Sequence, residues 1–183
     1  MAIHPETTVT TERVYTGKVV TLRKDTVRTG NGGTAIREIV EHAPVVVMVP
    51  VTADGEILLI RQFRKPVERV LFEVPAGLIE PGESIETAAR REMVEETGYE
   101  PATMELLTSI YPSPGMTDEL MHIFRVSDLQ GSGIPTEPDD ELETVRMSLS
   151  EARSMVTDGR IQDAKTVIGI LLLDESITPT GEK

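Results

Sequence analysis

Residues 77–99 read GLIEPGESIETAARREMVEETGY, and this stretch decides the fold. Before it, apolar residues alternate or run together as in strands. Within it the period becomes helical, and residues 84–97 are predicted to form a helix. Ser84 is the expected N-cap, and Gly98 is expected to end the helix at C′. The stretch therefore predicts a loop, a helix and a second loop.

The inward face of this helix carries acids among its apolar residues. At about 100° per residue, with Glu92 at zero, Ile85 lies near 20°, Glu96 near 40° and Ala89 near 60°. Glu95 lies about 60° to the other side of Glu92. Buried acids need a partner, and like charges four residues apart repel. Either a hard cation such as Mg²⁺ balances them, or the helix end projects into solvent.

The same stretch resembles the Nudix box, in which these residues stand at fixed spacings. The matching positions are Gly77, Glu83, Arg91, Glu92, Met93, Glu95, Glu96, Gly98 and Tyr99. The resemblance implies a hydrolase that cleaves a nucleoside diphosphate linked to another moiety. It also implies a Nudix-type α/β/α sandwich with a mixed sheet.

The family resemblance assigns a role to each part of the box. It implies that Mg²⁺, or alternatively Mn²⁺, is held by Glu92, Glu96 and the backbone carbonyl of Ala76, with Glu95 close by. Such ions bridge to the diphosphate, so an acidic protein can still bind it.

Other box residues are expected to support the loops. Arg91 and Glu83 are predicted to hold the loop to the helix as an ion pair, with a direct chemical role as the alternative. Gly77 and Gly82 are expected to let the loop before the helix fold tightly.

Segments outside the box look like the ADP-ribose pyrophosphatase subfamily. They are Arg37–His42, Arg61–Arg64, Glu73–Gly77 and Ser113–Gly115 with Glu119. Pro114 and Gly115 are candidate substrate residues, since a proline about 15 residues after Tyr99 marks this subfamily. As an alternative, Ser-Pro-Gly is an ordinary turn.

The resemblance implies hydrolysis of ADP-ribose to AMP and ribose 5-phosphate. The alternatives are another nucleotide sugar, such as GDP-mannose, an oxidised nucleotide, or a non-catalytic nucleotide-binding sensor. Such a sensor usually loses box acids, and all of them are present here.

Four further residues are candidate substrate ligands. Arg64 is expected to reach phosphate, because its planar fork suits phosphate oxygens, or else to pair with Glu68. Glu73 is placed to face the site. Glu38 resembles the acid that recognises adenine, across a dimer interface, while Arg37 covers the base or is an ordinary exposed strand residue.

The acidic loop at residues 137–143 is expected to supply the general base. A carboxylate must take a proton from the attacking water. Glu141 matches best because it precedes the apolar Leu142, with Asp140 and Glu143 as alternatives. A solvated loop without a catalytic role is the remaining interpretation.

Composition restricts the functions available to the chain. It has 183 residues, no Cys and a formal net charge of −13. Thiolate metal sites and disulfides are excluded, and nucleic acid and anionic membranes are disfavoured as partners. No signal peptide or membrane-spanning run is recognised, so a cytoplasmic location is expected.

The remaining segments predict an α+β or mixed α/β fold. Strands are expected at 14–27 (a hairpin), 35–42, 44–51, 57–63, 70–74, 104–111, 121–126 and 144–149. Helices are expected at 84–97, 150–158 and 163–173. The expected divisions are a flexible N-terminus at 1–11, a β segment at 12–43, a Nudix domain at 44–175 and a flexible C-terminus at 176–183. The β segment is expected to form a homodimer.

Overall fold

A computed structural model describes residues 4–136 and 142–174, which form two compact units. The N-terminal unit contains residues 4–44 and 111–120. The core unit contains residues 45–110, 121–136 and 142–174.

The N-terminal unit is a three-stranded antiparallel sheet. Its strands, in the order β1-β2-β3, are Thr7–Thr16, Val20–Arg28 and Thr34–His42. The expected hairpin and the strand after it are therefore present, with tight turns before Val20 and after Thr29. Strand β1 begins at Thr7, within the segment 1–11 that was expected to be a flexible N-terminus, and Thr7 pairs with Arg28 on β2.

The segment Tyr111–Leu120 belongs to the N-terminal unit because it runs along β3. The amide of Val40 donates to the Met116 carbonyl at 2.8 Å. The amide of His42 donates to the Asp118 carboxylate at 2.9 Å. Hydrogen bonds donated by backbone amides at the end of β3 thus fix the loop that contains Pro114.

The core unit contains a four-stranded mixed sheet in the order β7-β4-β9-β8. These strands are β4 (Val45–Pro50), β7 (Ala76–Leu78), β8 (Tyr99–Ile110) and β9 (Met121–Gly131). Only the β4–β9 pair is parallel among the paired strands of this sheet in the described residues. Every residue of β4 is buried, and the strand lies within the one expected at residues 44–51.

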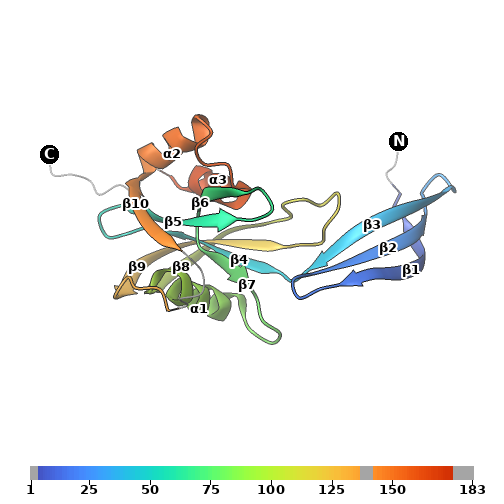
Figure 1. Cartoon of the computed structure of the whole chain (residues 1–183), viewed down its shortest axis with the longest axis horizontal. Helices are drawn as coiled ribbons and strands as arrows, with labels where there is room; N and C mark the ends of the chain where they lie inside the picture. Colours follow the sequence, from blue (N-terminus) through green and yellow to red (C-terminus); the bar gives the residue numbers. More distant parts are fainter. Residues whose placement is uncertain (1–3, 137–141, 175–183) are drawn as a thin grey trace. The chain divides into compact units, whose positions relative to one another are not determined.

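A second sheet and three helices complete the core unit. The sheet has the order β10-β5-β6, with strands Glu143–Ser148, Glu56–Arg64 and Arg69–Glu73. The helices are α1 (Ile85–Thr97), α2 (Leu149–Thr157) and α3 (Ala164–Leu172). Figure 1 shows α1 on one side of this unit and α2 and α3 on the other.

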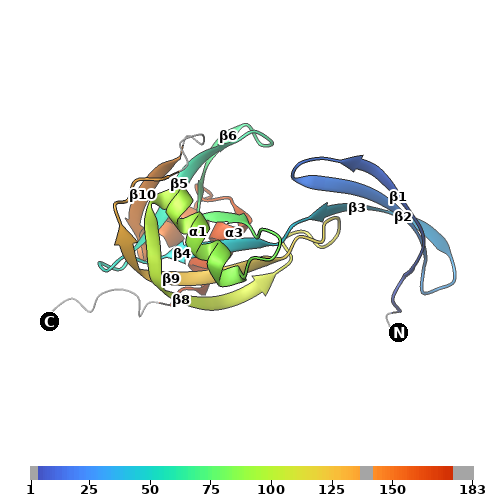
Figure 2. The same ribbon diagram turned by 90° about the horizontal axis from the view of Figure 1, so that it is seen from below.

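Strand β4 separates two hydrophobic clusters because its side chains alternate between its faces. Val46 and Met48 pack in the cluster that includes Ala89 of α1. Val47 and Val49 pack in the larger cluster with β5, α2 and α3. Figure 2 shows α1 lying across the four-stranded sheet. The expected mixed α/β sandwich is confirmed.

Several boundaries differ from those expected from the sequence. The short strand β7 was not expected, β8 begins at Tyr99 rather than at 104, and β9 reaches Gly131 rather than 126. Tyr99 pairs with Gly131, so the two extensions stabilise each other through a register that local patterns do not encode. None of the helices in the described residues is long and apolar enough to cross a bilayer.

Candidate active site

Helix α1 presents the box residues, and both of its ends are fixed as expected. The Ser84 hydroxyl accepts from the Thr87 amide at 3.1 Å. Gly98 adopts a left-handed φ of 71°, and its amide donates to Val94. A Cβ at Gly98 would also lie 2.2 Å from the Ile134 carbonyl oxygen. Glycine is therefore required there both by conformation and by space.

Arg91 connects the loop before α1 to the acids on the helix. Its Nε and Nη2 donate to the two Glu83 carboxylate oxygens at 3.1 and 3.0 Å, so the expected ion pair is present. Nη2 also donates to the Leu78 carbonyl at 2.9 Å. Nη1 reaches Glu92 at 2.7 Å and Glu95 at 2.9 Å. The hydrogen bond to Glu83 is the largest cause that raises the pKa of Arg91.

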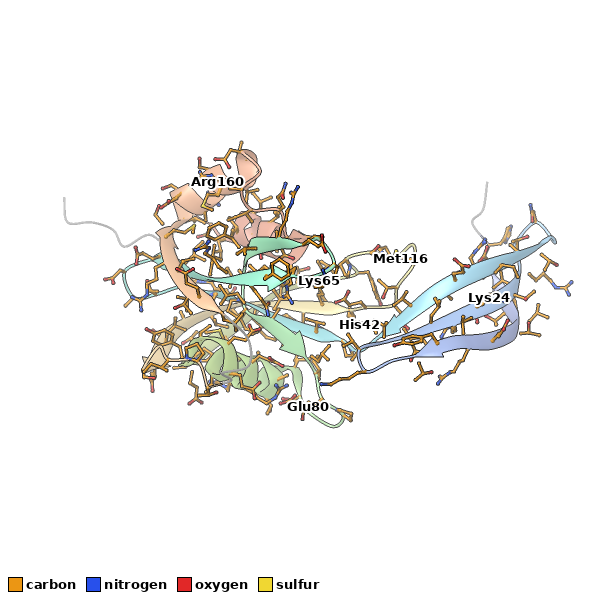
Figure 3. The ribbon with its side chains drawn as sticks, in the orientation of Figure 1. Lys24, His42, Lys65, Glu80, Met116 and Arg160 are labelled. Atoms are coloured by element: carbon orange, nitrogen blue, oxygen red, sulfur yellow. The ribbon has the colours of Figure 1, made fainter. Side chains whose placement is uncertain are left out.

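The loop itself is closed through Glu83 and Glu80. The amide of Glu80 donates to the Glu83 carboxylate at 3.1 Å, and Glu80 lies in the loop between β7 and α1 (Figure 3). Gly82 has a φ of 86°, which agrees with its expected role in a tight turn.

Gly77 has a different role from the one expected. A Cβ at this position would lie 1.8 Å from the Glu92 carboxylate carbon. Space for a carboxylate, rather than a tight loop, is therefore why glycine is needed there. The Glu92 carboxylate consequently lies directly against the backbone of β7.

Glu96 is a carboxyl group of the helix whose pKa is raised. Its Oε2 accepts from the Ala76 amide at 3.0 Å. Burial is the main cause that raises the pKa of Glu96, to about 8, and the charge of Glu92 raises it further. The hydrogen bond from Ala76 acts in the opposite direction. The helix thus places a partly buried acid beside a second acid.

We call Arg91, Glu83, Glu92, Glu95 and Glu96 the acidic cluster. No set of three His, Cys, Asp or Glu side chains among the described residues is arranged to hold a metal ion. The acidic cluster nevertheless fits a divalent cation, because Glu92 and Glu96 are hard oxygen donors whose like charges are adjacent. The space that Gly77 leaves open is filled by one of these carboxylates.

A second group of charges lies around Glu73, at the end of β6. Arg64 donates to the two Glu73 oxygens at 2.7 and 2.8 Å. Lys165 also bonds to Glu73, and it pairs with Asp163 at 3.0 Å. We call these four residues the ion-pair network. The alternative partner expected for Arg64, Glu68, pairs instead with Lys65 at 2.5 Å.

Sequence reasoning missed Lys165, Asp163 and Thr166. Asp163 caps α3, and Thr166 is fully buried, with its hydroxyl accepting from the Val74 amide at 2.8 Å. The available signal was a lysine in the mainly apolar segment 164–173, but a solvated lysine is the usual interpretation of such a residue.

The candidate adenine residues lie in the N-terminal unit. Glu38, Pro114 and Gly115 line a pocket of about 430 Å³, together with Arg37. Arg37 forms a two-pronged ion pair with Glu6 at 3.0 and 2.5 Å. The structure thus brings together four residues that the sequence places on two distant segments.

The expected general base, Glu141, lies outside the described residues, as does Asp140. Of the alternatives, Glu143 begins β10 and pairs with Arg61 at 2.6 Å. That ion pair gives Glu143 a structural partner on β5.

Comparisons with known proteins agree with this geometry. Residues 41–168 match the family model described as NUDIX domain, and residues 6–40 match the nucleoside diphosphate sugar hydrolase N-terminal domain. The chain is 38% identical over 170 residues to the ADP-ribose pyrophosphatase of Bacillus subtilis (strain 168), covering 92% of each chain. It is equally similar, over the same length and coverage, to the methanol dehydrogenase activator of Bacillus methanolicus.

A solved structure shares the fold. The crystal structure of ADP compounds hydrolase aligns with a TM-score of 0.85 and 24% identity. The alignment covers 99% of this chain and 98% of the other.

Proposed function

The chain belongs to the Nudix family, and from this premise we propose that it is an ADP-ribose pyrophosphatase that forms AMP and ribose 5-phosphate. The observation that supports this most is the Glu96 carboxylate, which is partly buried, is influenced by the charge of Glu92 and accepts a hydrogen bond from the Ala76 amide. Two adjacent acids in this setting need a divalent cation, and Nudix hydrolases generally use one. The similarity to the Bacillus subtilis ADP-ribose pyrophosphatase supports the choice of substrate.

We assign the metal ligands to Glu92, Glu96 and the Ala76 carbonyl, with Mg²⁺ as the ion and Mn²⁺ as a substitute. A bound divalent ion would neutralise diphosphate charge and lower the pKa of a water at the site. Arg91 holds Glu92 and Glu95 in place through ion pairs. Glycine at position 77 keeps open the space that the Glu92 carboxylate occupies.

The reaction adds one water across the diphosphate. The water oxygen bonds to one phosphorus, the bond from that phosphorus to the bridging oxygen breaks, and the bridging oxygen stays on the other phosphate. Glu141 receives the proton of the water in this proposal, as its position before the apolar Leu142 suggests. Arg64, whose side chain is 39% exposed, binds a phosphate oxygen through N–H groups that Glu73 does not occupy.

Glu38, Arg37, Pro114 and Gly115 form the adenine site in this proposal. They line one pocket, and the Glu38 carboxylate can accept from an exocyclic amino group. Arg37 can cover the base only if it leaves or shares its ion pair with Glu6.

A homodimer formed through β1–β3 is part of the proposal. Every residue of β1 is exposed, and the sheet exposes Val9, Val14, Tyr15 and Ile36 by half or more. An apolar surface of this kind is typical of an interface. Light scattering at micromolar concentration should give twice the chain mass, whereas a monomer would contradict the dimer.

Substrate profiling tests the activity. Purified protein is assayed with ADP-ribose, GDP-mannose and an oxidised nucleotide, with and without Mg²⁺ or Mn²⁺, and AMP and ribose 5-phosphate are quantified. We expect the highest kcat/KM for ADP-ribose. A higher value for another substrate would reject ADP-ribose but keep the reaction class, and no turnover of any of them would reject the enzyme.

A further inference from the structure

Lys165 is a buried cation with no assigned role in the chemistry above. It is the second residue of α3 and is 8% exposed. Its Nζ bonds to Glu73 and lies 3.0 Å from Asp163. A buried ammonium is costly unless it is paired, and here two carboxylates balance it.

Glu73 is held from two sides and has no oxygen left unengaged. It is 1% exposed, and Arg64 bonds to both of its oxygens while Lys165 bonds to Oε2. The sequence suggested that Glu73 faces the substrate, but these contacts direct its carboxylate toward protein cations. Its role is therefore to hold Arg64.

One edge of the Arg64 guanidinium is bound to Glu73, and among the described residues its other N–H groups are open. Glu73 takes two of the five N–H donors of its guanidinium, and the side chain is 39% exposed. A phosphate that binds the open edge also competes with Glu73 for the cation. A carboxylate attached to Arg64 alone could move with it, whereas Lys165 gives Glu73 a buried second attachment.

The same helix end also fixes the segment that leads to the acidic cluster. Thr166 binds the Val74 amide, and two residues later the Ala76 amide binds Glu96. Arg64 and Lys165 both act on the Glu96 carboxyl through their positive charge. The ion-pair network is therefore close enough to the acidic cluster to influence it.

We propose that Lys165 is a positioning residue that fixes Glu73 and, through Glu73, orients Arg64 toward a phosphate of the substrate. This inference rests on the proposed function in taking a nucleoside diphosphate as the substrate. Lys165 touches no reacting atom in this role and acts only through Arg64. A lysine that contacted substrate itself would act independently of Arg64.

A double-mutant cycle separates these two roles. Lys165→Met, which keeps the length of the side chain but not its charge, is made alone and together with Arg64→Ala. In the wild-type background we expect kcat/KM to fall about tenfold, mainly through KM, as for coupled neighbours. In the Arg64→Ala background the fall should be less than about twofold. Equal losses in the two backgrounds would overturn the proposal.

Controls distinguish orientation from unfolding. Arg160→Gln removes an exposed ion pair with Asp158 between α2 and α3 (Figure 3), and it should leave kcat/KM unchanged. Thermal unfolding is recorded for every variant. Should Lys165→Met not fold, the double variant Glu73→Gln/Lys165→Met is used, because it leaves no lone charge at the Glu73–Lys165 contact. The fall in kcat/KM that this double variant causes should likewise disappear in the Arg64→Ala background.

The wild-type assay keeps the two proposals apart. If another nucleotide sugar is the better substrate, ADP-ribose is rejected and the cycle is run with that substrate. If no diphosphate is cleaved, the proposed function fails. The positioning role of Lys165 is then tested with a crystal structure of Lys165→Met. An Arg64 guanidinium displaced from Glu73 would support the positioning role, and an unchanged two-pronged pair would refute it.

Discussion

The acidic cluster and the ion-pair network lie in the same unit but differ in their charge balance. In the acidic cluster one cation, Arg91, pairs with three glutamates, and the charge of one of these, Glu92, also acts on the fourth, Glu96. In the ion-pair network Arg64 and Lys165 face Glu73 and Asp163. Charge removed from water is stable only when it is paired, so the acidic cluster, with its excess of carboxylates, is the proposed cation site, and the balanced network is not. The proposed carboxylate ligands of the metal therefore lie in the acidic cluster, whereas the ion-pair network holds Arg64, the proposed phosphate ligand, among paired charges.

Glu96→Gln should have the largest effect of the substitutions, because it removes a carboxylate from the cluster that is the proposed cation site. The amide oxygen can still accept from Ala76, so folding is preserved. We expect kcat/KM to fall about 1,000-fold, or about 4 kcal/mol, and the stabilisation by Mg²⁺ in thermal unfolding to be reduced. Glu86→Gln, on an exposed face of α1, is the matched control and should change neither. Retained activity with an unaltered metal requirement would refute the metal assignment.

Glu73→Gln tests the charge balance of the ion-pair network by its effect on the free energy of unfolding. Burial alone would raise the pKa of Glu73, but the hydrogen bond from Arg64 and the charge of Lys165 outweigh it and lower the pKa. Breaking a buried pair of this kind should lower the free energy of unfolding by about 3 kcal/mol at pH 7.

The pH dependence follows from the direction of that shift. A glutamate whose pKa is lowered by folding stabilises the protein fully above its ordinary pKa, 4.5, and loses this as pH falls through the folded value. Urea unfolding should therefore show the gap between wild type and Glu73→Gln closing below about pH 4.5. A gap that stays constant down to pH 3 would mean that folding does not lower the pKa of Glu73.

Gly77→Ala sharpens the comparison by moving one acid without removing a charge. The added methyl overlaps the Glu92 carboxylate, which must shift. We expect kcat/KM to fall about 100-fold, because misplacement by about 1 Å has an effect of that size. Gly82→Ala is the contrast, since its Cβ meets no atom within 4 Å but its φ of 86° is strained. It should lower stability by about 1 kcal/mol and spare most of the activity.

Thr166→Val should have the smallest effect of the four substitutions, since it removes a hydrogen-bonding hydroxyl but no charge. It leaves the buried Val74 amide without the hydroxyl that it donates to, so unfolding free energy should fall by about 2 kcal/mol. Thr157→Val removes an exposed bond to Arg153 and should cost less than about 0.5 kcal/mol. Equal losses of unfolding free energy in the two variants, measured by urea unfolding, would show that the hydrogen bond between Thr166 of α3 and the Val74 amide does not contribute to stability.

Local signals explain which parts of the site could be predicted. Ser84 and Gly98 bound α1 because capping depends on a few neighbouring residues. Glu83 and Arg91 form the expected pair because the spacing of the box brings them together. By contrast, the partner of Arg64 could not be read from the sequence, because Glu68 is closer in the chain than Glu73 but points elsewhere.

The amino-acid sequence was enough to predict the family, the helix with its caps, most of the strands and the acids of the box. These follow from periodicity, residue type and short spacings. Only the tertiary structure decided the burial of Lys165, the space that Gly77 leaves for Glu92, and the register that extends β8 and β9. The reason is physical, since burial and steric contact depend on residues far apart in the chain, and these meet only after the strands and helices have packed.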